Sequence, residues 1–242
     1  MRRAEFTREK VGGIQPAMRD STKKAFQGLV DLVIGLALLL FLPAWTLSYW
    51  QGWIFLAVFS VSVSAITAYL VRKDPKRLER RLNAGPTAEK ETRQKVIQFF
   101  ALIAFIVVVI VPPIDHRLRW YAVPPYMSVM GDLLVALGLL VIFFVFKANT
   151  YASATIEVTA DQKLITTGPY AFVRHPMYFG ALVMLIGVPL ALGSYWGLLA
   201  VIPITLVLIW RLVDEEKVLA TDLAGYVQYQ IQVRQRLLPF IW

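Results

Sequence analysis

Residues 177–210 read MYFGALVMLIGVPLALGSYWGLLAVIPITLVLIW and contain no charged side chain. Two apolar runs, near Met177–Leu192 and Tyr195–Leu212, are separated here only by Gly193-Ser194. Because a bilayer core about 30 Å thick needs about 20 helical residues, each run is close to the length of a transmembrane helix. The stretch therefore predicts a tight hairpin of two membrane helices, since no longer linker is present.

Four more apolar runs lie upstream, near Leu29–Leu47, Trp53–Val71, Val96–Val111 and Ser128–Phe146. Hydrophobic residues make up 57% of the 242-residue chain and charged residues only 17%, whereas soluble domains carry about a quarter charged residues. The mean hydropathy is +0.58. We therefore expect an all-α integral membrane protein with about six transmembrane helices, the last two forming the hairpin, followed by a cytoplasmic helical tail.

Loop charge predicts the orientation in the membrane. The arm before the first run is rich in Lys and Arg, the Ser48–Gly52 connection has no charge, and the connection 72–95 is basic again. Basic loops face the cytoplasm, so both termini and the loops beside residues 174 and 215 are expected there. The same clustering explains the net charge of +9 by contact with anionic lipid headgroups rather than with nucleic acid.

Three regions follow from this pattern. We expect a flexible basic arm over residues 1–25, a four-helix membrane region over 26–148, and a cofactor-binding loop, hairpin and tail over 149–242. The chain has no cysteine, so a disulfide or a sulfur-ligated metal is excluded. His116 and His175 are expected on opposite sides of the membrane, so we expect no metal site. The oligomeric state stays open.

A polar cluster precedes the hairpin, in the stretch GPYAFVRHPMYFG over residues 168–180. The residue before a proline is disfavoured in the helical region, so His175 is expected to be extended, with Pro176 as the first helical residue. The free N–H groups of a helix start favour an anion, and Arg174 adds a cation. The simpler alternative is a helix cap whose arginine reaches lipid headgroups.

A second charged group follows the hairpin. Arg211 and Glu215 are four residues apart and share one helix face if the helix continues past the membrane. They are either a surface ion pair or, beside hydrocarbon, a functional site. The aromatic and basic tail after Gly225 is typical of an interfacial anchor, with a lid over a cofactor as the alternative.

Together these residues support a family resemblance. The run Lys163–Tyr170, the Arg174-His175-Pro176-Met177-Tyr178 cluster, and Glu215-Glu216 followed by Tyr226 and Tyr229 resemble the isoprenylcysteine carboxyl methyltransferase family. Membrane phospholipid N-methyltransferases share the same C-terminal pattern. The resemblance covers about the last two fifths of the chain, from Asn149 to Trp242.

The resemblance implies methyl transfer from S-adenosylmethionine to a lipophilic or amphiphilic acceptor, a carboxylate or an amine, at the cytosolic membrane face. It implies a cofactor site lined by the following residues: Leu164, Ile165, Tyr170, His175, Pro176, Met177, Tyr178, Glu215 and Glu216. Arg211 occupies a family position assigned to substrate, and Arg211, Arg174 and Glu215 are the expected catalytic residues. Gln162 stands where eukaryotic members often have His, so a cofactor contact there is in question.

Two other functions stay open at this stage. Sterol reductases that use a nicotinamide cofactor look similar in their C-terminal region, although this chain offers only six apolar runs. A non-enzymatic membrane scaffold is the other alternative. It predicts that substitutions at His175 and Glu215 leave function intact.

Overall fold

The computed structural model describes residues 2–74, 78, 87, 89, 91–118, 120, 123–152, 156, 158 and 162–242, with side chains from Thr22 onward. Its elements are α1 (Arg2–Ala44), α2 (Trp50–Lys73), α4 (Thr92–Leu118), α5 (Pro125–Ala148), the 3-10 helix η1 (Gly168–Ala171), α6 (Pro176–Ala191), α7 (Gly197–Asp222) and α8 (Tyr226–Gln232). The described residues form no strand, which confirms the expected all-α class.

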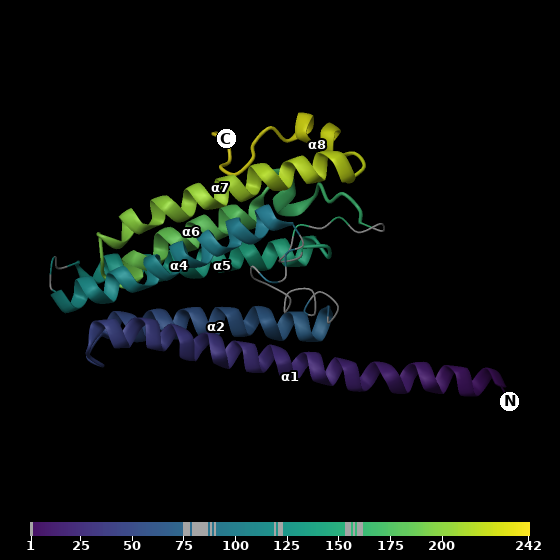
Figure 1. Cartoon of the computed structure of the whole chain (residues 1–242), viewed down its shortest axis with the longest axis horizontal. Helices are drawn as coiled ribbons and strands as arrows, with labels where there is room; N and C mark the ends of the chain where they lie inside the picture. The colour runs from purple at the N-terminus through teal and green to yellow at the C-terminus, as the bar shows by residue number, and fades with distance from the viewer. Residues whose placement is uncertain are drawn as a thin grey trace.

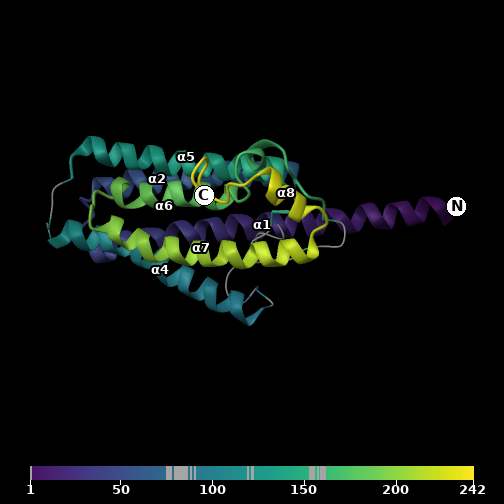
Figure 2. The same ribbon diagram turned by 90° about the horizontal axis from the view of Figure 1, so that it is seen from above.

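Five helices are long and apolar enough to cross a membrane: Thr22–Ala44 within α1, and α2, α4, α5 and α7. They run along one common long axis (Figures 1 and 2). The remaining expected span is α6, an apolar helix of only 16 residues. At 1.5 Å per residue it is about 24 Å long, shorter than the hydrocarbon core. The integral membrane class is therefore confirmed, with one of the six apolar helices short.

Two helices are longer than their apolar runs. α4 continues through Pro112 and Pro113 to Leu118 instead of ending near Val111. Both prolines are buried. A Cβ added at Gly197 would lie 3.0 Å from the Pro112 ring, so this part of α4 packs against the start of α7. The helix has this packing at the point where its two prolines lack a backbone N–H. α1 extends back to Arg2, so the expected boundary at residue 25 is not a helix end. The flexibility of that arm stays a prediction.

The α5–α6 pair is the closest helix contact, because glycines face each other along it. A Cβ added at Gly138 would lie 2.5 Å from the Gly180 carbonyl oxygen, and one at Gly131 would lie 2.0 Å from the Ala191 nitrogen. A Cβ at Gly187 would likewise lie 2.7 Å from the Gly131 oxygen. Small residues let two membrane helices approach backbone to backbone. This contact fixes the position of α6, which carries the candidate site at its first turn.

Polar bonds hold the end of the bundle opposite α8. The Tyr49 hydroxyl donates to the Leu192 carbonyl at 2.5 Å, and the Ser194 hydroxyl donates to Asp115 at 2.6 Å. These bonds tie the α1–α2 connection and the end of α4 to the α6–α7 turn. His116 stacks on Tyr49 at a centroid distance of 4.3 Å. It therefore lies at the opposite end of the bundle from His175, which precedes α6.

The α6–α7 hairpin and the tail bring distant segments to one end of the bundle. A turn with Gly193 at φ 71° joins the two helices, so the start of α6 lies beside the end of α7. The tail returns from α8 over these helices (Figures 1 and 2). The Arg174 and His175 amides donate to the Gln235 and Arg236 carbonyls, both at 2.9 Å. Three segments therefore meet at residue 174.

Candidate active site

The loop before α6 has the local geometry that its sequence predicts. Gly168 has φ 64° and begins η1, a conformation that glycine adopts without steric cost. His175 has φ −122° and ψ 62°, and Pro176 is the first residue of α6. This geometry is the expected consequence of a proline at residue 176. It directs the side chains of residues 174 and 175 toward α7.

The Glu216 carboxylate is the centre of a buried ion cluster. Its Oε1 atom accepts from Arg174 Nε at 2.7 Å and lies 3.3 Å from His175 Nε2. Its Oε2 atom lies 3.0 Å from Arg236 Nε. The side chains of Arg174 and Glu216 are only 6% and 7% exposed. Buried charges of this kind require partners, and here the partners come from two segments of the chain, the loop before α6 and the tail.

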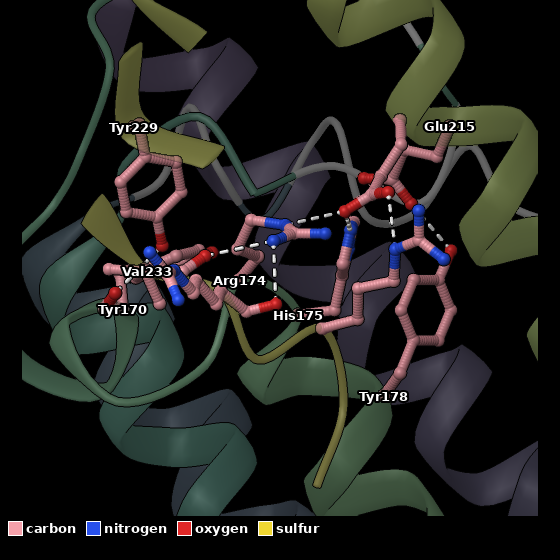
Figure 3. A network of polar contacts seen from close by, with 10 residues as sticks. Tyr170, Arg174, His175, Tyr178, Glu215, Tyr229 and Val233 are labelled. Atoms are coloured by element: carbon pink, nitrogen blue, oxygen red, sulfur yellow. Dashed lines mark hydrogen bonds and ion pairs between the residues drawn. The ribbon is translucent and has the colours of Figure 1, made fainter. Parts of the chain in front are cut away.

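Arg174 also binds the tail directly. Its Nη1 atom donates to the Val233 carbonyl at 2.8 Å and to the Arg234 carbonyl at 2.9 Å, as Figure 3 shows for Val233. The same residue therefore contacts α7 through Glu216 and the tail through two carbonyl oxygens. Arg174 therefore lies beside the start of α6, as expected, and it also joins α7 to the tail.

A second polar group surrounds Tyr178, in the first turn of α6. Its hydroxyl donates to Glu215 Oε2 at 2.6 Å and accepts from Arg211 Nε at 3.1 Å (Figure 3). Arg211 and Glu215 thus share one helix face, as their spacing predicts, but Tyr178 connects them. Among the described residues, Tyr178 provides the one hydrogen bond to Glu215.

Two residues that the sequence did not single out also bind Arg211. Its Nη2 atom donates to Glu89 at 2.8 Å and its Nη1 atom to Gln94 at 3.2 Å. Glu89 and Gln94 are buried. Gln94 also donates to Asp214, which pairs with Arg93 at 3.1 Å. The guanidinium of Arg211 is therefore bound on three sides by α6, α4 and the segment before α4.

The remaining expected cofactor residues do not all lie together. The Tyr170 hydroxyl accepts from Asn149 at 2.8 Å, and the Tyr170 carbonyl accepts from the Tyr229 hydroxyl at 2.7 Å. Leu164 packs against a buried cluster on α8. Ile165 is half-buried, and Pro176 is buried. Met177 instead packs against a different buried cluster, which includes Leu70 and Phe146. Gln162 is half-buried.

Tyr226 is a further residue of interest at this end of the bundle. Its side chain is buried, and its hydroxyl has no hydrogen-bond partner among the residues described. Burial raises the pKa of its phenol well above the ordinary value of about 10, and the charges of Glu216 and Glu215 raise it further. The hydroxyl is thus a protonated donor beside two carboxylates. Such a group is a candidate ligand contact.

Fold and site together define an integral membrane protein with a buried, charged site at one end of a helical hairpin. Residues 126–223 match the family model described as Phospholipid methyltransferase. The match confirms the resemblance predicted from the sequence, and the general class that it supports is a membrane methyltransferase. It covers about two fifths of the chain, including Arg174, Tyr178, Arg211, Glu215 and Glu216 but not the tail. No curated protein matches the chain.

Proposed function

We propose that the protein transfers a methyl group from S-adenosylmethionine to a carboxylate or amine of a lipophilic or amphiphilic acceptor at the cytosolic membrane face. The observation that carries this proposal is the meeting of Arg174 and Tyr178 with Arg211, Glu215 and Glu216 in one polar site on a membrane hairpin. The family match supports it because both halves of that site fall within the matched residues.

The charges of the site fit a zwitterionic cofactor. Arg174 and Arg236 face a single carboxylate, Glu216, so this cluster keeps a positive excess suited to the carboxylate of S-adenosylmethionine. Glu215 has hydrogen-bonding capacity left beside it, which suits the cationic end of the cofactor. The unpartnered hydroxyl of Tyr226 offers one more donor. The residues present therefore fit the group that the family implies.

Methyl transfer requires the protein mainly to position the two reactants and to exclude water from the site. When bound, S-adenosylmethionine supplies a methyl group activated by its sulfonium sulfur. Displacement at that carbon depends on alignment and on the exclusion of water. Leu164, Ile165, Tyr170 and Pro176 provide the walls in this proposal, and His175 orients Glu216 through the contact at 3.3 Å.

Arg211 constrains how the acceptor enters. Because Glu89, Gln94 and Tyr178 already bind its guanidinium, an acceptor carboxylate competes with these partners for Arg211. An amine acceptor instead is held by the carboxylates of Glu215 and Glu89. Both acceptor classes remain within the proposal, and the lipid tail of either enters from the bilayer between the helices.

The cytosolic placement rests on the distribution of basic residues. The site end of the bundle includes the start of α1 and the end of α2, where Arg72 and Lys73 lie in the last turn. It also includes Lys147 in the last turn of α5. The α1–α2 connection at the other end carries no charge. Basic loops stay on the cytoplasmic side during insertion.

Calorimetric titration of the detergent-purified protein with S-adenosylmethionine tests the proposal. We expect saturable binding to the native chain and loss of at least about tenfold in affinity for Glu215→Gln, since one hydrogen bond to a charged group contributes about 1.5–3 kcal/mol. Asp222→Asn is the matched control because Asp222 is an exposed carboxylate at the end of the same helix. No binding to the native chain contradicts the proposal.

A further inference from the structure

The last loop of the chain, Leu237–Trp242, displays apolar side chains to its surroundings. Phe240 is 93% exposed and Ile241 is 79% exposed, whereas Leu237 at the base of the loop is buried. When two neighbouring large apolar side chains are as exposed as these, they indicate a contact surface. The proposed methyl transfer uses none of these residues.

The loop is built to hold those two side chains outward. The Leu237 and Leu238 amides both donate to the Trp242 carbonyl at 2.8 Å, which closes the loop. Phe240 has φ 65°, a left-handed conformation that costs free energy for a residue with a side chain. Arg236 lies over the Trp242 ring at 5.4 Å. The exposure of Phe240 and Ile241 is therefore a property of a hydrogen-bonded loop.

The position of the loop indicates what it contacts. Gln235 and Arg236 pair through their carbonyls with the two residues before α6, so the loop lies beside the end of a membrane hairpin. Figures 1 and 2 both show the last residues lying over α6 and α7, rather than beyond the end of the bundle. The outward faces of these helices are apolar too, with Ile186 and Trp210 exposed. The surface is continuous with the face that lipid covers.

We propose that the loop Leu237–Trp242 docks into an anionic lipid leaflet on the side of the candidate site. Phe240 and Ile241 enter the boundary between headgroups and acyl chains, and the exposed Arg234 meets anionic headgroups. Aromatic and basic residues side by side are typical of segments at this depth. Because residues 233–236 bind Arg174 and His175, lipid docking stabilises one wall of the candidate site.

A single fluorophore tests the docking, because the native chain has no cysteine. Ile241→Cys, labelled with a nitrobenzoxadiazole dye and placed in bilayer discs, reports the surroundings of the loop. Thr221→Cys is the control, since Thr221 is exposed at the end of α7. We expect doxyl-labelled lipid to quench the dye at residue 241 about threefold or more above the dye at 221, and aqueous iodide to show the reverse order.

Lipid composition and a second variant test the charge. We expect phosphatidylserine to increase quenching by doxyl lipid at residue 241, and Arg234→Gln to remove most of that increase. The proposal is overturned if iodide quenches the dyes at 241 and 221 equally. It is also overturned if quenching by doxyl lipid at 241 does not change with phosphatidylserine. Circular dichroism of each labelled variant confirms that the helices are intact. None of these readouts depends on methyl transfer, so failure of the proposed function leaves the test unaffected.

Discussion

Arg174 and Glu216, 42 residues apart in the sequence, form a buried ion pair with an Nε–Oε1 distance of 2.7 Å. The pair joins the loop before α6 to α7, across the open end of the hairpin. Arg174 extends the link to the tail through Val233. A single arginine thus connects three of the segments that form the candidate site.

Removing the charge of Glu216 should destabilise the protein strongly. Glu216→Gln leaves the buried Arg174 and His175, and the partly exposed Arg236, without their common carboxylate. Breaking a buried ion pair on one side costs about 3–5 kcal/mol. Thermal unfolding in detergent should show a large fall in Tm for Glu216→Gln and no change in Tm for the control, Asp222→Asn. An unchanged Tm for Glu216→Gln contradicts a structural role for the cluster.

Arg211→Lys should separate acceptor handling from cofactor binding. A lysine cannot bind Glu89, Gln94 and Tyr178 in three fixed directions, so we expect methyl transfer to fall about tenfold to a hundredfold. Affinity for S-adenosylmethionine should stay within about threefold, as measured by calorimetry. Arg93→Lys is the control, since Arg93 is about half exposed. A parallel loss of cofactor affinity assigns Arg211 to the cofactor instead.

Tyr226→Phe and Tyr229→Phe form a matched pair. The Tyr226 hydroxyl has no partner among the described residues, whereas that of Tyr229 donates to the Tyr170 carbonyl at 2.7 Å. We expect Tyr226→Phe to keep full stability and lose about tenfold in cofactor affinity. Tyr229→Phe should lose about 1 kcal/mol of stability. Unfolding and calorimetry on both variants check this, and unchanged affinity in Tyr226→Phe removes Tyr226 from the site.

Alkaline pH should destabilise the tail through the same two phenols. Burial raises the pKa of Tyr226 and of Tyr229 above the unfolded value of about 10. A raised pKa means that the folded state keeps its protons after the unfolded state has released them, so stability is complete below pH 10 and falls as the pH rises above it. Unfolding measured at pH 8 and pH 11 should show this loss, reduced in Tyr226→Phe. A loss that Tyr226→Phe does not reduce rules out this phenol as a source.

Gly138→Ala should prevent α5 and α6 from packing. The added Cβ lies 2.5 Å from the Gly180 carbonyl oxygen, and backbone atoms cannot move aside as a flexible side chain does. Gly35→Ala is the matched control, because a Cβ there meets nothing within 4 Å. We expect a clear fall in Tm or loss of folded protein for the first variant only. Equal stability of the two variants contradicts the close backbone contact.

Local pattern predicted much of this fold. Apolar runs located α2, α5 and the hairpin, and Pro176 predicted both the start of α6 and the backbone of His175. The hairpin also predicted that residues near 174 and 215 lie at the same end. The helix length after Pro112 was not predictable, because packing against α7 decides whether a proline ends a membrane helix.

The contacts of the site were less predictable. Glu89 and Gln94 bind Arg211 from 122 and 117 residues away, and no local spacing marks such a pair. The tail binds the loop through the carbonyls of Val233 and Arg234, which any residue type provides. The sequence did offer a signal that Asp214 belongs to the site, since it is an acidic residue within the group that contains Arg211 and Glu215.

The most direct measurement of the central claim is methyl transfer from S-adenosylmethionine, radiolabelled on its methyl group, into a lipid extract by the purified protein. We predict label in the organic phase for the native chain and for Asp222→Asn, and about a hundredfold less for Glu215→Gln. Saponification of the product then distinguishes a methyl ester from an N-methylated lipid. Label in the organic phase no higher than in a protein-free blank, from native protein that is folded, contradicts the account.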